Sequence, residues 1–183
     1  MKKKLTICLL TLAMLVQTPG IYAAGITVVQ AESELVNGVY QLSAEMRYQF
    51  SPQILDALQN GVPIPIALDI AIYRRRTLLW DELITELKQQ FELRYLALIN
   101  KYVVKNINSG FEESFIKLES MLDFLRIIEG LPLVDQNILS SQERYYARVR
   151  SRIDVEELPI PLRLRAYVSS SWDLASQWYQ CAL

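Results

Sequence analysis

The 183-residue chain contains no histidine and only two cysteines, Cys8 and Cys181. Without histidine, the chain lacks the commonest general base, the usual zinc ligand and the imidazole of Ser-His and Cys-His nucleophiles. Glycine and proline are also scarce, with 6 and 7 residues, which excludes collagen-like and low-complexity architectures. Hydrophobic residues make up 51% and charged residues 21%, as in folded globular proteins. We therefore expect a folded protein that is not an enzyme and holds no cofactor or metal.

The N-terminus has the three-part pattern of a secretory signal. Three lysines follow Met1, an apolar run extends from Leu5 to Val16, and the small residues Ala23 and Ala24 come after it. Twelve residues of helix cover about 18 Å, which is short of the roughly 30 Å hydrocarbon core of a bilayer. We expect residues 1–23 to be a signal peptide cleaved after Ala23, with Ala24 as the alternative, and residues 24–183 to be a single β-rich periplasmic domain. A leader that stays uncleaved would make the protein membrane-associated.

Cleavage would change both the thiol count and the charge. Cys181 would be the only cysteine left, so no internal disulfide can form, and we interpret it as a small packing residue with a reactive thiol as the alternative. Without the three lysines, the basic count falls from 19 to 16 against 20 acidic residues, a net charge of −4. Nucleic-acid binding needs clustered excess positive charge, so we expect no nucleic-acid partner.

The first half of this domain shows clear periodicities. Polar and apolar residues alternate from Val39 to Phe50, which predicts a half-buried strand. Ser51-Pro52 begins a short helix that Asn60-Gly61 ends. A second strand follows Val62, and arginines 74–76 are predicted to lie in a turn at its end. Residues 77–90 fit a helix or a strand equally well, while residues 102–104 look extended. The expected inner residues of the second strand are Ile64, Ile66, Leu68, Ile70 and Ile72.

The second half predicts one long helix and two strands. Apolar residues recur every three or four positions over about Glu112–Glu129, which predicts the helix. Alternation over Tyr145–Val155 and again over Ile160–Trp172 predicts two strands, joined at residues 156–159 by a hairpin or a corner between sheets. The fold class is therefore mainly β (α+β): a two-layer antiparallel β-sandwich-like domain with one long and one short α-helix.

Arginines form the strongest candidate site. If the last two strands pair, six of them share one sheet face, where guanidinium groups could bind carboxylates or phosphates of an anionic peptide, a lipid headgroup or an acidic partner segment. The alternative is a solvated, salt-bridged surface in which neighbouring acids pair with them. The six arginines are Arg144, Arg148, Arg150, Arg152, Arg163 and Arg165, and the candidate acids are Asp69, Glu86, Glu92, Asp154, Glu156 and Glu157.

Two further possibilities stay open at this point. Trp80, Trp172 and Trp178, with ten tyrosines, could line a pocket for a small apolar ligand or lipid between the sheets, although such residues more often fill a sandwich core. Paired carboxylates for glycosidase-type chemistry are the enzymatic alternative, but the spacing of the 20 acidic residues selects no pair.

Characteristic positions lie dispersed from about Gln30 to the C-terminus: residues 61–64, 74–76, Trp80-Asp81, 93–95, 101–102, 115–118, 148–152, 158–163, Trp172 and Trp178. Together they resemble one family, the proteobacterial domain-of-unknown-function family numbered 4390. The resemblance implies an exported protein, encoded in many genomes beside a membrane sensor histidine kinase, and it brings no catalytic residues. The leading hypothesis is thus a non-enzymatic envelope protein that acts as an accessory or sensing partner of a membrane signalling protein.

Overall fold

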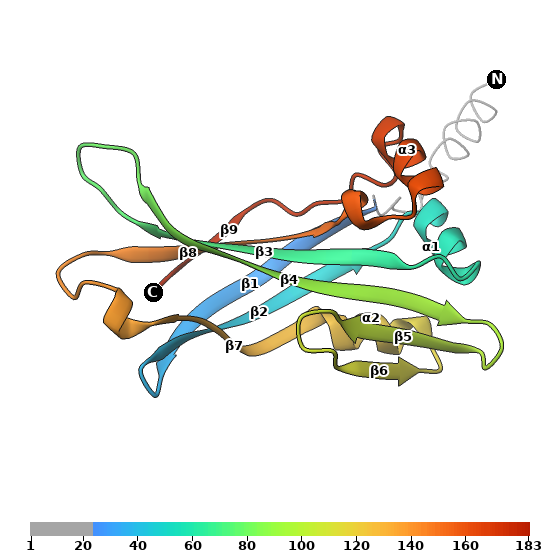
Figure 1. The fold of residues 1–183 in the computed structure, drawn as a ribbon, viewed down its shortest axis with the longest axis horizontal. Coiled ribbons are helices and arrows are strands. Elements are labelled where there is room, and N and C mark those ends of the chain that lie inside the picture. Colours follow the sequence, from blue (N-terminus) through green and yellow to red (C-terminus); the bar gives the residue numbers. More distant parts are fainter. Residues whose placement is uncertain (1–23) are drawn as a thin grey trace, which may run out of the picture.

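The computed structural model describes residues 24–183, so the predicted signal peptide lies outside the described residues. The chain forms two antiparallel sheets, which confirms the predicted mainly β, two-layer class (Figure 1). One sheet has the order β1-β2-β7 and the other β6-β5-β4-β3-β8-β9. Their strands are β1 (Gly25–Val36), β2 (Val39–Gln49), β3 (Ile64–Arg74), β4 (Glu82–Leu96), β5 (Lys101–Asn106), β6 (Glu112–Phe115), β7 (Ile127–Asp135), β8 (Tyr145–Ile153) and β9 (Tyr179–Ala182).

Three α-helices and two 3₁₀ turns complete the described chain: α1 (Pro52–Gln59), α2 (Leu118–Arg126), α3 (Ile160–Val168), η1 (Gln136–Ile138) and η2 (Val155–Glu157). The predicted start of α1 is confirmed, because Ser51 Oγ accepts a hydrogen bond from the backbone N–H of Ile54 at 3.3 Å. None of the helices in residues 24–183 has the length and apolar character needed to span a bilayer.

The turn between β1 and β2 is Asn37-Gly38, whose φ angles are 50° and 82°. Positive φ at both positions is what a two-residue hairpin requires, because such a turn matches the right-handed twist of the strands. The turn fixes the register from Val36 opposite Val39 to Gly25 opposite Gln49, with one irregularity near Gln30. The predicted alternation in β2 is confirmed, since Leu42, Ala44, Met46 and Tyr48 are all buried.

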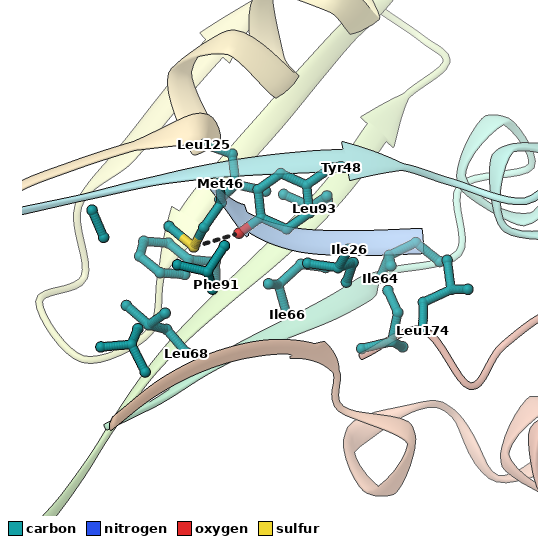
Figure 2. Close-up of a cluster of buried hydrophobic side chains, with 14 of the residues drawn as sticks. Ile26, Met46, Tyr48, Ile64, Ile66, Leu68, Phe91, Leu93, Leu125 and Leu174 are labelled. Carbon is teal, nitrogen blue, oxygen red and sulfur yellow. Dashed lines mark hydrogen bonds between the residues drawn. The ribbon is translucent and has the colours of Figure 1, made fainter. Parts of the chain in front are cut away.

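β3 is a central strand of the larger sheet, and most of its residues are buried. Its five predicted inner residues, Ile64, Ile66, Leu68, Ile70 and Ile72, are each at most 1% exposed. All five belong to the core cluster, and Figure 2 shows Ile64, Ile66 and Leu68 together with Ile26, Met46 and Tyr48 of the smaller sheet. On its outer face, Ala67 and Ala71 are also buried, at 0% and 3% exposure. The outer face is only partly covered, because Pro65, Asp69 and Tyr73 on it are half-buried. The core is thus built around the inner row of β3.

Two sequence predictions are wrong in the second half. Instead of one helix over Glu112–Glu129, the chain forms β6, the nine-residue α2 and the start of β7. Met121 and Leu125 are the buried residues of α2, whereas Ile127 and Ile128 pair with Glu45 and Ala44 of β2. Sheet pairing therefore overrides the helical periodicity at both ends. Residues 82–96, part of which stayed undecided, form β4.

The predicted strand Ile160–Trp172 and its hairpin with β8 are also wrong, because residues 160–168 form α3. Pro161 lies in the first turn of that helix, where a backbone N–H is not needed. β9 instead pairs with β8, with Gln180 opposite Arg148, and occupies the edge that the predicted strand would have used. Arg163 and Arg165 consequently lie on a helix and not on the arginine-bearing sheet face.

Tyr48 links the two sheets through the core. Its hydroxyl lies 3.1 Å from Ser151 Oγ of β8 and donates to Met46 Sδ at 3.4 Å (Figure 2). Burial raises the pKa of Tyr48 to about 12, although the Ser151 hydrogen bond opposes the shift.

Substituting Tyr48→Phe should lower the free energy of unfolding at neutral pH by about 1 kcal/mol, because Ser151 loses its partner. The unfolded chain releases the tyrosine proton near pH 10, so wild-type stability should also fall as the pH rises from 10 to 12. The variant should lack that part of the decline. Denaturant titrations at several pH values measure both effects. Tyr40→Phe is the control, and equal stability of wild type and Tyr48→Phe would contradict the prediction.

Candidate functional site

The outer face of β8 carries three of the six predicted arginines. Arg148, Arg150 and Arg152 point outward, while their neighbours Ala147, Val149 and Ile153 are buried in the core. They lie opposite Ala71, Asp69 and Ala67 of β3, respectively. The two alanines leave room above β3, so the arginine side chains can lie along the sheet. The prediction that these three arginines share a face is confirmed.

Arg150 and Arg152 are held by carboxylates. Both donate to Asp69 Oδ2, from Arg150 Nη2 at 2.9 Å and from Arg152 Nε at 2.8 Å, and Arg152 Nη1 donates to Asp154 Oδ1 at 2.8 Å. Asp154 is 1% exposed and also forms an ion pair with Lys88. For these two arginines the salt-bridged alternative is confirmed, with Asp69 and Asp154 as the partners.

Burial alone would raise the pKa of Asp154, but the hydrogen bonds with Lys88 and Arg152 outweigh it, so the pKa lies below its usual value. The same two bonds stabilise the ionised carboxylate in the folded chain. This acidic group therefore fixes the C-terminal end of β8 to β4 across the outer face.

Arg148 lies among aromatic rings and shares the Trp178 ring with Arg150, whose guanidinium carbon lies 4.6 Å from the ring centre. The guanidinium carbon of Arg148 lies 5.9 Å from the ring centre of Tyr73 and 5.1 Å from that of Trp178. Within residues 24–183, no carboxylate lies within ion-pair distance of it. The Tyr73 ring stacks on Tyr146 at 5.5 Å, and Arg75 lies 5.1 Å from the Tyr146 ring centre. We call Arg75, Tyr146, Tyr73, Arg148 and Trp178 the arginine–aromatic ladder.

The base of the β3–β4 loop anchors the ladder at one end. Tyr146 donates its hydroxyl proton to Asp81 Oδ2 at 2.7 Å, and the backbone N–H of Arg76 donates to Asp81 Oδ1 at 3.0 Å. These two hydrogen bonds lower the pKa of Asp81, while burial, followed by the bond to Asp81, raises the pKa of Tyr146. Arg74 and Arg76 both pair with Glu82. The turn predicted for residues 74–76 is wrong for Arg74, which is the last paired residue of β3, and only Arg75 of the three joins the ladder.

A half-open pocket of about 820 Å³ adjoins Arg75 and Tyr146. Arg144 lines it from the segment before β8, together with hydrogen-bonding groups of Asn137 and Ser141. Among the described residues, neither Arg75 nor Arg144 has an ion pair. Glu143 also lines the pocket, so an anion there would meet one carboxylate as well as two arginines. The two arginines could still hold a carboxylate or phosphate. The sequence pattern did not single out Tyr73, Tyr146 or Arg75 for this role, because only the sheet register brings them together.

The remaining predicted residues lie elsewhere. Arg163 donates from Nη2 to the carbonyl of Leu158 at 3.1 Å, and Arg165 is exposed on α3. Glu92 pairs with Arg94, while Glu86, Glu156 and Glu157 form no ion pair within the described chain. Of the tryptophans, Trp172 is buried, Trp178 is 36% exposed on the ladder, and Trp80 is 92% exposed on a loop. Cys181 is a buried free thiol, as expected of a packing residue.

Substituting Asp154→Asn should destabilise the fold by about 2 kcal/mol at pH 7, because Arg152 and Lys88 lose a buried anionic partner. The folded-state pKa of Asp154 is depressed, so its contribution is present above the ordinary aspartate value of 3.8 and is lost as the pH falls below it. Wild type and variant should therefore converge in stability at acid pH. Thermal melts from pH 7 to pH 3 measure this, with the exposed Asp56→Asn as control; a constant difference across that range would contradict it.

Comparisons with known proteins place the chain in a family. Neither the search of curated proteins nor the search of solved structures gave a match. Residues 23–182 match the family described as domain of unknown function DUF4390, which covers nearly the whole chain. The resemblance noted in the sequence is thereby confirmed, and the chain belongs to the DUF4390 family.

Proposed function

We propose that this protein is a non-enzymatic binding module of the bacterial envelope that recognises an anionic segment of a partner protein. One observation carries the proposal. Arg75, Arg144 and Arg148 lie on or beside the arginine–aromatic ladder and have no carboxylate partner among residues 24–183, whereas Arg150 and Arg152 are neutralised by Asp69 and Asp154.

The ladder prepares its arginines for binding. An aromatic ring contacts the flat face of a guanidinium group and leaves the N–H groups at its edge free to donate. Because Arg148 is flanked by Tyr73 and Trp178, it loses little side-chain freedom when an anion binds. Charge-assisted hydrogen bonds to carboxylate or phosphate contribute roughly 1.5–3 kcal/mol each. Two or three such arginines on one surface would therefore suffice for a specific contact of moderate affinity.

The proposed partner is a membrane signalling protein such as a sensor histidine kinase. The expected export of the chain and the gene neighbourhood implied by the family resemblance support this choice. The charge distribution supports an acidic binding segment: the domain as a whole carries −4 after removal of the three leader lysines, yet the ladder presents cationic groups. A local positive surface on an acidic domain favours one orientation of approach.

A carrier of a small apolar ligand is the second candidate. A half-open pocket of about 330 Å³ supports it, lined in part by Phe91 of β4 and by Ile128, Leu131 and Pro132 of β7. The inner faces of the two sheets are otherwise filled by the side chains of the core cluster. A native mass spectrum of protein purified from the envelope should show a bound small molecule if this candidate is right, and the mass of the bare polypeptide if it is wrong.

Charge reversal tests the leading proposal. Arg75→Glu combined with Arg148→Glu should reduce recovery of the partner at least tenfold in affinity purification from crosslinked cells, because two of the three unpaired cations are inverted. Raising the salt concentration should weaken the wild-type complex in the same assay. The matched control is Arg47→Glu, an exposed arginine of β2 on the opposite sheet. Partner recovery that is equal for wild type, the double variant and the control would contradict the proposed site.

A further inference from the structure

Helix α3 turns an apolar stripe toward solvent. Ile160, Leu164, Tyr167 and Val168 are 71%, 67%, 63% and 88% exposed. Their spacing of four, seven and eight residues from Ile160 places them on one side of a helix. The opposite side meets the protein, since Ala166 is buried and Leu162 packs against the core. A surface helix ordinarily points its polar side to water, so this orientation requires an apolar neighbour.

The charge of α3 indicates what that neighbour is. The nine residues of the helix include Arg163 and Arg165 and no acidic residue. Arg163 is partly engaged with the Leu158 carbonyl, whereas Arg165 is exposed. Glu156 and Asp173 line the pocket beside the helix and would repel an anionic surface. Attraction of α3 to such a surface therefore depends on Arg165 and on the apolar stripe together. Tyr167 and Val168 line that pocket as well, whereas Ile160 and Leu164 lie outside its lining. An apolar stripe next to an exposed arginine on a surface helix suits the interface of an anionic bilayer.

The position of α3 supports the same occupant. Gly25, at the start of β1, pairs with Gln49 at the end of β2. Ser51 follows shortly after Gln49, and its hydroxyl donates to the backbone carbonyl of Ser171 at 2.8 Å. Ser171 lies just after the end of α3. The start of the described chain therefore lies near the end of α3 that leads into Ser171. In the alternative in which the leader stays uncleaved, its apolar run from Leu5 to Val16 comes shortly before Gly25 in the sequence, so this end of the domain would stay close to the membrane.

A second apolar projection lies at this end of the sandwich. The turn between β4 and β5 presents Leu98 and Ile99 at 101% and 59% exposure. In Figure 1 this turn, α1 and α3 occupy one end of the molecule, and the β3–β4 loop lies at the other. Two exposed apolar projections at one end can meet the same flat surface.

We propose that α3 is a membrane-docking helix that inserts Ile160, Leu164, Tyr167 and Val168 into the interface of a bilayer containing anionic phospholipid, with Arg165 at the headgroups. The site is separate from the arginine–aromatic ladder, so the two proposals can fail independently. Docking through α3 would hold the domain at a membrane surface while the outer sheet face stays open to a partner.

Vesicle flotation tests the proposal with the protein as cells produce it. The wild type should float with vesicles of phosphatidylcholine containing phosphatidylglycerol and should bind at least tenfold less to pure phosphatidylcholine. Leu164→Ser combined with Val168→Ser should reduce binding to the anionic vesicles at least tenfold, and Arg165→Glu should reduce it severalfold in a salt-dependent way. The control is Leu78→Ser combined with Leu79→Ser, an exposed pair at the opposite end, which should float like the wild type.

Far-ultraviolet circular dichroism should show the same fold for all four proteins, because every substituted residue is exposed. Three results would overturn the proposal: wild-type flotation at background, as expected if the stripe contacts a protein instead; equal flotation on neutral and anionic vesicles; or equal binding by the α3 variants and the control.

Discussion

The central position of β3, whose inner row and two outer alanines are buried, is the constraint on which the rest of this structure depends. One face supplies the row from Ile64 to Ile72 that packs against the smaller sheet. The other carries Ala67 and Ala71, which are too small to shield themselves from water and are covered by side chains from neighbouring strands. An arginine layer on the outer face is therefore partly a structural requirement, because long arginine stems can cover apolar surface while their charged ends reach partners or solvent.

The arginines of this outer face fall into two groups, according to whether a carboxylate pairs with them. Arg150 and Arg152 converge on Asp69, the one acidic residue of β3, and Asp154 extends that network to Lys88. Arg148, which precedes Arg150 on β8, lies opposite Ala71 and contacts the rings of Tyr73 and Trp178, and no carboxylate within residues 24–183 pairs with it. Position along β3 thus decides which cations are neutralised and which stay available. The proposed recognition surface follows from that local difference and not from the number of arginines.

Where burial and local chemistry agree, the sequence predicted the structure well: β2, α1, β3 and β8 have the expected faces. It failed where long-range pairing decides the outcome. The helical periodicity of residues 112–129 does not reveal that Glu112–Phe115 pairs with β5 and that Ile127–Asp135 pairs with β2. Alternation in residues 160–168 resembles a strand, but the edge of β8 is occupied by β9. For the same reason the site was predicted only in part, since Tyr73, Tyr146 and Arg75 meet through sheet register alone.

Site-specific photocrosslinking in living cells tests the central claim most directly. A photoreactive residue in place of the exposed Gln180, which lies opposite Arg148 in the sheet, should form adducts with one envelope protein. The same residue in place of Glu32, exposed on β1 of the other sheet, should not form those adducts. No adduct from position 180, or the same adducts from both positions, would contradict recognition through the outer face of the larger sheet.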